Sequence, residues 1–117
     1  MSVYFMTGDA KTLLKNFDER IEQSEPKGKI TTWEKSDDGI YYTHKSPQWA
    51  KEAWFKPAVH SDRLLFNIIK PGNKNVSIIA YGYYHGHLIE TFLNHFEDQF
   101  SLGAATAKPS KNDLVSD

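Results

Sequence analysis

The segment 64–69 places the strongest constraint on the fold of this 117-residue chain. It is apolar at every position except Asn67, and its composition favours a β-strand. Successive side chains of a strand point to opposite faces, so Leu64 faces one side and Leu65 the other. A strand with one face in water would alternate apolar and polar residues. Both faces of this strand therefore need a cover.

Two amphipathic helices are expected to supply part of that cover. The apolar residues of segment 8–24 recur at the i, i+3, i+4, i+7 spacing of a single helical stripe, and Pro26 with Gly28 ends the segment. A second and wider stripe runs from Leu88 to Phe100, with polar and acidic residues on the opposite side. We expect both helices to pack on the same face of a sheet.

The strands are expected to form two hairpins. In the first, the strand-like segments 29–34 and 40–44 are joined by a turn at 35–39. In the second, the segments 64–69 and 76–81 are joined by a turn at 71–75. In the first turn, the Asp38-Gly39 pair can supply the positive φ angles of a tight reversal. Segment 46–54, between the hairpins, predicts a short helix, because Ser46 is a good N-cap and Pro47 suits the first helical position.

These elements predict the fold class α+β, with two layers and one domain over residues 1–100. One layer is an antiparallel sheet of about four strands, formed by the two hairpins. The other layer is the N-terminal and the C-terminal amphipathic helix on one face of the sheet, and the short helix lies between the hairpins. Residues 101–117 contain few large apolar side chains, so we expect a flexible C-terminal tail.

Composition excludes several functional classes. The chain has 14 basic and 15 acidic residues, so it lacks the positive excess of a polybasic nucleic-acid binder. It has no cysteine, which excludes disulfides, thiol nucleophiles and cysteine-ligated metals. Its apolar runs are too short for a membrane helix, and its first residues lack the features of a targeting peptide. We expect a cytoplasmic protein without a cofactor and without membrane contact.

The most informative segment for ligand binding is 80–88, which leads from the predicted fourth strand into the last helix. A helix N-terminus presents free amide groups that hold a carboxylate or a phosphate. The candidate ligand-binding residues are Tyr83, Tyr84, His85, Gly86 and His87. The alternative is purely structural: the glycines make the turn, a tyrosine packs, and the histidines cap the helix. No phosphate-loop motif accompanies these residues, and the structural alternative is favoured.

Metal binding and catalysis have little support in the sequence. His85 and His87 would diverge by roughly 200° on a helix, so they could not share an ion there, and no metal site is predicted. The consecutive residues His60, Ser61 and Asp62 cannot form a triad, because triad side chains converge from separate segments. No catalytic residue is therefore assigned, and an enzyme is not the favoured class.

The central region 26–75 carries nine basic and five acidic residues, between two acidic flanks. Trp33 and Tyr42 lie among Lys29, Lys35 and Lys45 in the first hairpin, a mixture that suits single-stranded nucleic acid. The same residues are ordinary strand formers with lysines that protect an edge. Nucleic acid is therefore not the expected partner, and a nucleic-acid accessory protein is the third function considered.

The favoured function is a small interaction module that associates with itself, as a homodimer. Its candidate interface residues are Trp49, Trp54, Leu65 and Ile69. Trp49 and Trp54 lie on the predicted short helix, which is expected to cover part of the second sheet face, and a second copy would cover the rest. The first alternative is a small-molecule or anion-binding protein, or a small enzyme, with its site around Tyr83 and His87.

Overall fold

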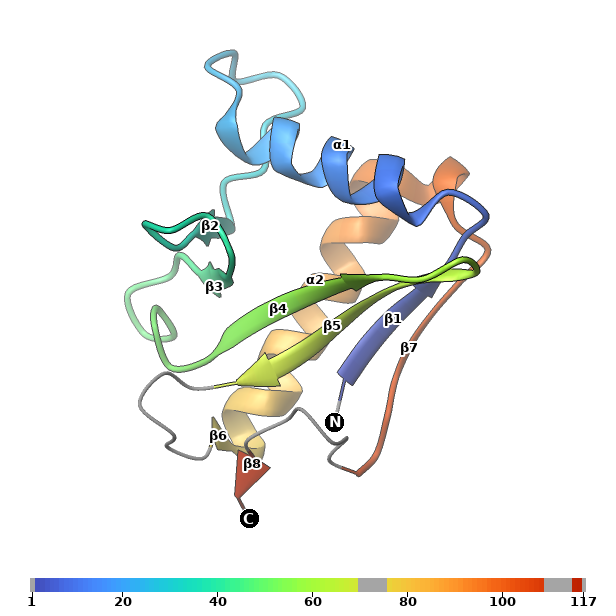
Figure 1. Ribbon diagram of the computed structural model, residues 1–117. Coiled ribbons are helices and arrows are strands. Elements are labelled where there is room, and N and C mark those ends of the chain that lie inside the picture. Colours follow the sequence, from blue (N-terminus) through green and yellow to red (C-terminus); the bar gives the residue numbers. More distant parts are fainter. Residues whose placement is uncertain (1, 70–75, 109–114, 117) are drawn as a thin grey trace.

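The computed structural model describes residues 2–69, 76–108 and 115–116. Within them, one six-stranded antiparallel sheet of order β2-β3-β4-β5-β1-β7 carries two α-helices, and β6 and β8 form a small parallel pair (Figure 1). The elements in chain order are β1 (Ser2–Met6), α1 (Ala10–Glu22), β2 (Trp33–Lys35), β3 (Tyr42–His44), β4 (Trp54–Val59), β5 (Arg63–Ile69), β6 (Val76–Ser77), α2 (Ile78–Phe96), a 3-10 turn (Glu97–Gln99), β7 (Leu102–Ala105) and β8 (Val115–Ser116).

The core lies between the sheet and the helices and is built around phenylalanine rings. Phe5 of β1 stacks on Phe92 of α2, with ring centroids 4.1 Å apart and planes 11° apart. Phe17 of α1 contacts Phe92 at 5.0 Å and Phe66 of β5 at 5.9 Å. All four rings are fully buried. Because these rings meet, α1 and α2 lie on the same face of the sheet, and Figure 1 shows α2 behind β4, β5 and β1.

The predicted sheet of about four strands is wrong, because the sheet has six. One missed strand is β1, which pairs with β5 on one side and with β7 on the other. Val3 and Phe5 point into the core from this strand. Its sequence is short and apolar at most positions, so neither a turn signal nor a clear alternation marked it as a strand.

The predicted short helix at 46–54 is also wrong. Residues 46–52 form turns, and the chain enters β4 at Trp54. Pro57, which cannot continue a helix, lies inside β4, opposite Phe66 of β5. On its other side β4 pairs with β3 only through Phe55 and Tyr42. A proline has no N–H to donate, so it is tolerated where one side of a strand is unpaired.

The predicted second hairpin, 64–69 with 76–81, is a third correction. β5 pairs with β4 and β1, and only Val76 and Ser77 of the second segment are extended. The predicted turn at 71–75 lies outside the described residues. From Ile78 the chain is helical, and the Ser77 hydroxyl accepts the Ala80 N–H at 3.1 Å as the N-cap. Among the described helices, none combines the length and the apolar composition needed to cross a bilayer.

The predicted flexible tail begins too early in the chain. Leu102–Ala105 forms β7, and Phe5 of β1 lies opposite Gly103. A Cβ built on Gly103 would lie 3.1 Å from the Phe5 ring, so the small residue lets β7 pass close to the core. The Tyr81 hydroxyl donates to the Thr106 carbonyl, which fixes the chain beyond β7. Residues 109–114 and 117 of the predicted tail lie outside the described residues.

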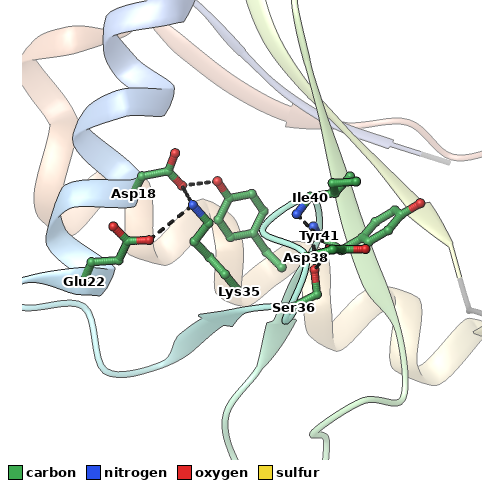
Figure 2. Close-up of polar contacts among 8 residues, drawn as sticks. Asp18, Glu22, Lys35, Ser36, Asp38, Ile40 and Tyr41 are labelled. Carbon is green, nitrogen blue, oxygen red and sulfur yellow. Dashed lines mark hydrogen bonds and ion pairs between the residues drawn. The ribbon is translucent and has the colours of Figure 1, made fainter.

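The β2–β3 hairpin is fastened to α1 by a polar cluster (Figure 2). The Lys35 ammonium lies 3.5 Å from the Asp18 carboxylate and 3.3 Å from that of Glu22. The Tyr42 hydroxyl donates to the same Asp18 carboxylate. Gly39 has a φ of 76°, the left-handed conformation that this turn was predicted to need. The hairpin therefore has a fixed orientation relative to the helix.

Replacing Phe92 with alanine should lower the free energy of unfolding by about 3–5 kcal/mol, because the buried ring joins both helices to the sheet. Denaturant titration followed by circular dichroism measures this loss. Leu93→Ala is the matched control, since the neighbouring side chain is 51% exposed and its truncation should cost less than about 1 kcal/mol. Equal losses in the two variants would contradict the placement of Phe92 at the centre of the core.

Candidate functional site

The predicted ligand-binding residues 83–87 lie inside α2 and not at its start. The helix begins at Ile78, so Tyr83 is already in its second turn and the amides around it are engaged in helical hydrogen bonds. The anion site predicted from a helix N-terminus therefore loses its physical basis at these residues.

The five residues also point in different directions. Tyr84 and His85 are buried against the sheet, whereas Gly86 is exposed on the outer side of the helix. Tyr83 and His87 are half-buried and face the loop that follows β3. The structure thus divides the predicted site into a buried pair, an exposed glycine and a pair at the surface.

Tyr83 and His87 join Trp49 and His44 in a group that we call the ring cluster. The Trp49 and Tyr83 rings stack with centroids 4.3 Å apart and planes 19° apart. The Tyr83 and His87 rings stack at 4.0 Å and 23°. His44, which is buried at the end of β3, meets Tyr83 edge-on at 5.2 Å. Trp49, predicted as an interface residue, is therefore part of a helix-side cluster instead of a cover for the second sheet face.

A buried hydrogen-bond network holds the Trp49 loop against α2. The Thr43 hydroxyl accepts the Lys51 N–H at 3.0 Å and donates to the Ala53 carbonyl at 2.9 Å. The Tyr84 hydroxyl donates to the Trp49 carbonyl. Lys51 has a φ of 62°, which is uncommon for a residue with a side chain. The loop therefore has one arrangement, fixed from both ends.

The two histidines of the ring cluster have defined proton positions. The Ser46 N–H donates to His44 Nδ1 at 3.0 Å, so the proton of the neutral His44 ring lies on Nε2. That Nε2 is 3.4 Å from His87 Nδ1, a long contact in which His44 is the donor. Burial, and then the neighbouring His87, lowers the pKa of His44 below its usual value.

These proton positions make the histidine pair a poor metal site. Coordination through His44 Nε2 would need a lone pair where the proton lies. In the described part of the chain, no group of three or more His, Cys, Asp or Glu residues is placed to hold an ion. Chemically, the ring cluster offers aromatic surface and one N–H donor on His87 Nε2. The stacked rings of this cluster pack the Trp49 loop against α2.

His85 is the most strongly perturbed group of the predicted site. Its ring is 3% exposed and lies between Tyr81, at 3.7 Å, and Phe55, at 5.1 Å. Nδ1 donates to the Tyr81 carbonyl at 2.7 Å, and Nε2 has no hydrogen-bond partner among the described residues. Burial lowers the pKa of His85 to about 4 although the Tyr81 bond opposes the shift. The residue is a core histidine held in its neutral form.

The other three predicted interface residues lie together on the sheet face opposite the helices, which we call the outer sheet face. Residues paired across strands share a face, so the register assigns the members of this surface. They are Ser2, Tyr4, Met6, Trp54, Lys56, Ala58, Arg63, Leu65, Asn67, Ile69, Leu102 and Ala104. Trp54, Leu65 and Ile69 are each half-buried.

An apolar row crosses four strands of the outer sheet face. Ala58 of β4 lies opposite Leu65, Leu65 opposite Tyr4, and Tyr4 opposite Ala104 of β7. The sequence indicated one of the four members of this row, Leu65. It missed Ala58, Tyr4 and Ala104, because β4, β1 and β7 were not predicted as strands.

The basic hairpin buries two of its aromatic residues, Trp33 and Tyr42, and leaves Tyr41 half-buried. Trp33 and Tyr42 are 1% and 2% exposed, and the Trp33 indole N–H donates to the Thr91 hydroxyl at 2.9 Å. Lys35 is engaged by two carboxylates of α1. Base stacking needs an accessible ring, so the arrangement expected for a single-strand binder is absent from the described hairpin.

A depression of about 740 Å³ runs along the end of α1. Its lining mixes both charge signs with amides, among them Glu19, Arg20 and Lys27. Arg20 already donates to the Gly28 carbonyl at 3.3 Å and contacts His95 Nδ1 at 3.5 Å. Because Arg20 is already engaged within the chain, this wide polar groove offers little basis for selective ligand binding.

Comparison with known proteins adds no identification. No family model matches the chain, and neither a curated protein nor a solved structure matches it. The function must therefore be argued from the geometry of the molecule.

His85 should make the protein less stable as the pH falls. Its pKa is about 4 in the folded chain and near 6.5 when unfolded, so the unfolded state binds the extra proton first. The contribution of neutral His85 to the free energy of unfolding is complete above pH 6.5 and is lost as the pH falls towards 4. The total loss from this group is about 3 kcal/mol.

Denaturant titrations at several pH values test this expectation. His85→Phe should remove this share of the pH dependence, whereas His60→Gln, at an exposed histidine, should leave it unchanged. The slope due to His44 and His95, whose pKa values burial also lowers, should remain in both variants. An unchanged pH profile in His85→Phe would place His85 outside the core.

Proposed function

We propose that this protein is a non-enzymatic interaction module that associates with a second copy of itself through the outer sheet face. The observation that carries the proposal is the apolar row from Ala58 to Ala104, on the face that neither α1 nor α2 covers. Folded monomers rarely expose a contiguous apolar surface of this kind, and such surfaces are typical of protein contacts. We place this interaction in the cytoplasm on the sequence prediction alone.

The apolar row places no charge at the centre of the proposed interface. The apolar row is uncharged, and the charged members of the outer sheet face, Lys56 and Arg63, lie on either side of it. The Arg63 guanidinium lies 4.0 Å from the Asp62 carboxylate and over the Tyr4 ring at 5.7 Å. Two copies related by a two-fold axis would each bury Leu65 and Tyr4 in the other, in an interface that closes after two chains.

Two further apolar pairs extend the proposed interface along the strands. Trp54 lies opposite Ile69 at one end, and Met6 lies opposite Leu102 at the other. Leu102 is 53% exposed, so its side chain would gain burial from a partner. Trp54 is a large aromatic residue of the type that is enriched at the energetic centre of interfaces.

Light scattering on the full chain at tens of micromolar should give twice the monomer mass of 13.4 kDa, with the dimer fraction falling on dilution. Leu65→Glu should return the chain to the monomer mass, because it places a charge in the middle of the apolar row. Ile79→Glu is the matched control. Ile79 is a 75% exposed apolar residue of α2, away from the outer sheet face, and its replacement should leave the dimer intact.

Circular dichroism would show that both variants remain folded. A monomer mass for the unmodified chain at every concentration would refute self-association. A dimer that survives Leu65→Glu and dissociates in Ile79→Glu would place the interface on α2 instead.

A further inference from the structure

A hollow of about 360 Å³ lies on the outer sheet face near the β2–β3 hairpin. It is lined by Tyr41, Lys56, Pro57, Ala58, Asn67 and Ile69, from the start of β3, from β4 and from β5. Lys56 and Asn67 are cross-strand neighbours, and the small side chain of Ala58 leaves space beside them. The volume is at the lower end of the range of small-molecule sites.

The Tyr41 wall of this hollow is held in place by the hairpin turn. The Tyr41 N–H donates to the Ser36 hydroxyl at 3.0 Å, and the Ser36 N–H donates to the Tyr41 carbonyl at 2.8 Å. Figure 2 shows the Tyr41 side chain directed away from Asp18, Glu22 and Lys35. The wall is therefore formed before any ligand arrives, which lowers the entropy cost of binding.

The lining combines apolar surface with one charged group, which is positive. The Tyr41 ring, the Ala58 methyl group and the Ile69 side chain supply apolar surface. Lys56 supplies an ammonium group, and none of the six lining residues is acidic. The hollow is therefore complementary to a molecule with an apolar body and a negative group.

Among the described residues, Lys56 is the cation of the outer sheet face that has no ion-pair partner. The other cation, Arg63, lies beside Asp62. Within the described residues, the ion pairs are formed by Lys15, Lys35 and Arg63 and do not include Lys56. A carboxylate held beside Lys56 would make the pairing that is missing here.

We propose that this hollow binds a small carboxylate with a flat or branched apolar body. The carboxylate lies beside the Lys56 ammonium, and the body packs between Tyr41, Ala58 and Ile69. One chain supplies all six lining residues, so the site does not require the self-association proposed above.

The test is a titration of the 15N-labelled full chain with sodium benzoate, followed by 1H–15N correlation spectra. Benzoate should shift the amide signals of Tyr41, Lys56, Ala58 and Ile69 along saturating curves. Benzamide keeps the ring without the charge, and acetate keeps the charge without the ring. Each should bind about tenfold more weakly than benzoate. Light scattering at the same protein concentration, with and without benzoate, gives the mass, so binding and self-association are measured separately.

Two variants locate the site. Lys56→Met keeps most of the side-chain length but not the charge, and should weaken benzoate binding about tenfold. Lys45→Met, at an exposed lysine outside the hollow, is its control and should bind as the unmodified chain does. Ala58→Phe fills the hollow and should abolish saturable binding while the spectrum stays that of a folded protein. Shifts that do not saturate, equal binding of benzamide and benzoate, or equal effects of the two lysine variants would each overturn the proposal.

Discussion

The stack of Phe5 on Phe92 is the contact on which the rest of the structure depends. Phe5 lies on β1, between β5 and β7, and Phe92 lies on α2, so this contact joins an interior strand of the sheet to the helix that covers it. Phe17 brings α1 to the same place, and Phe100 leads the chain from α2 into β7 with its ring 5.2 Å from that of Phe5. β1, α1, α2 and the segment that leads into β7 therefore meet at one group of aromatic rings.

The two faces of the sheet follow from this arrangement. One face is filled by both helices, and α2 also presents Tyr84 to the Trp49 loop, so the ring cluster is an extension of the core toward the surface. The other face keeps the apolar row and the hollow. The proposed functions depend on the second face. Its apolar row and Lys56 do not contribute to the core between the sheet and the helices.

The sequence predicted the features that depend on local patterns. The period of the apolar residues around Phe17 and Phe92 indicated both helices, and Asp38-Gly39 indicated the turn of the first hairpin. The sequence also predicted that segment 64–69 needs cover on both faces, because this follows from six consecutive residues. It led to Leu65 and Ile69, which lie on the outer sheet face.

The features that the sequence did not reveal depend on distant partners. Val3 and Phe5 become a central strand only because β5 and β7 lie on either side, and Gly103 fits only because the Phe5 ring is opposite. Ile78 and Ile79 favour a strand by intrinsic preference, but the buried side of Tyr81, Tyr84 and Leu88 extends the helix through them. The ring cluster was missed as a unit, because His44 and His87 are brought together by a strand and a helix far apart in the chain.

The interior position of β1 also decides when the sheet can form during synthesis. Phe5 is synthesised well before its partner Leu64 on one side and Gly103 on the other. Until both have followed, an apolar strand lacks its neighbours, in the state in which nascent chains are most prone to wrong pairing. A chaperone that shields residues 2–6 during synthesis would therefore protect a strand that is paired on both sides in the finished sheet.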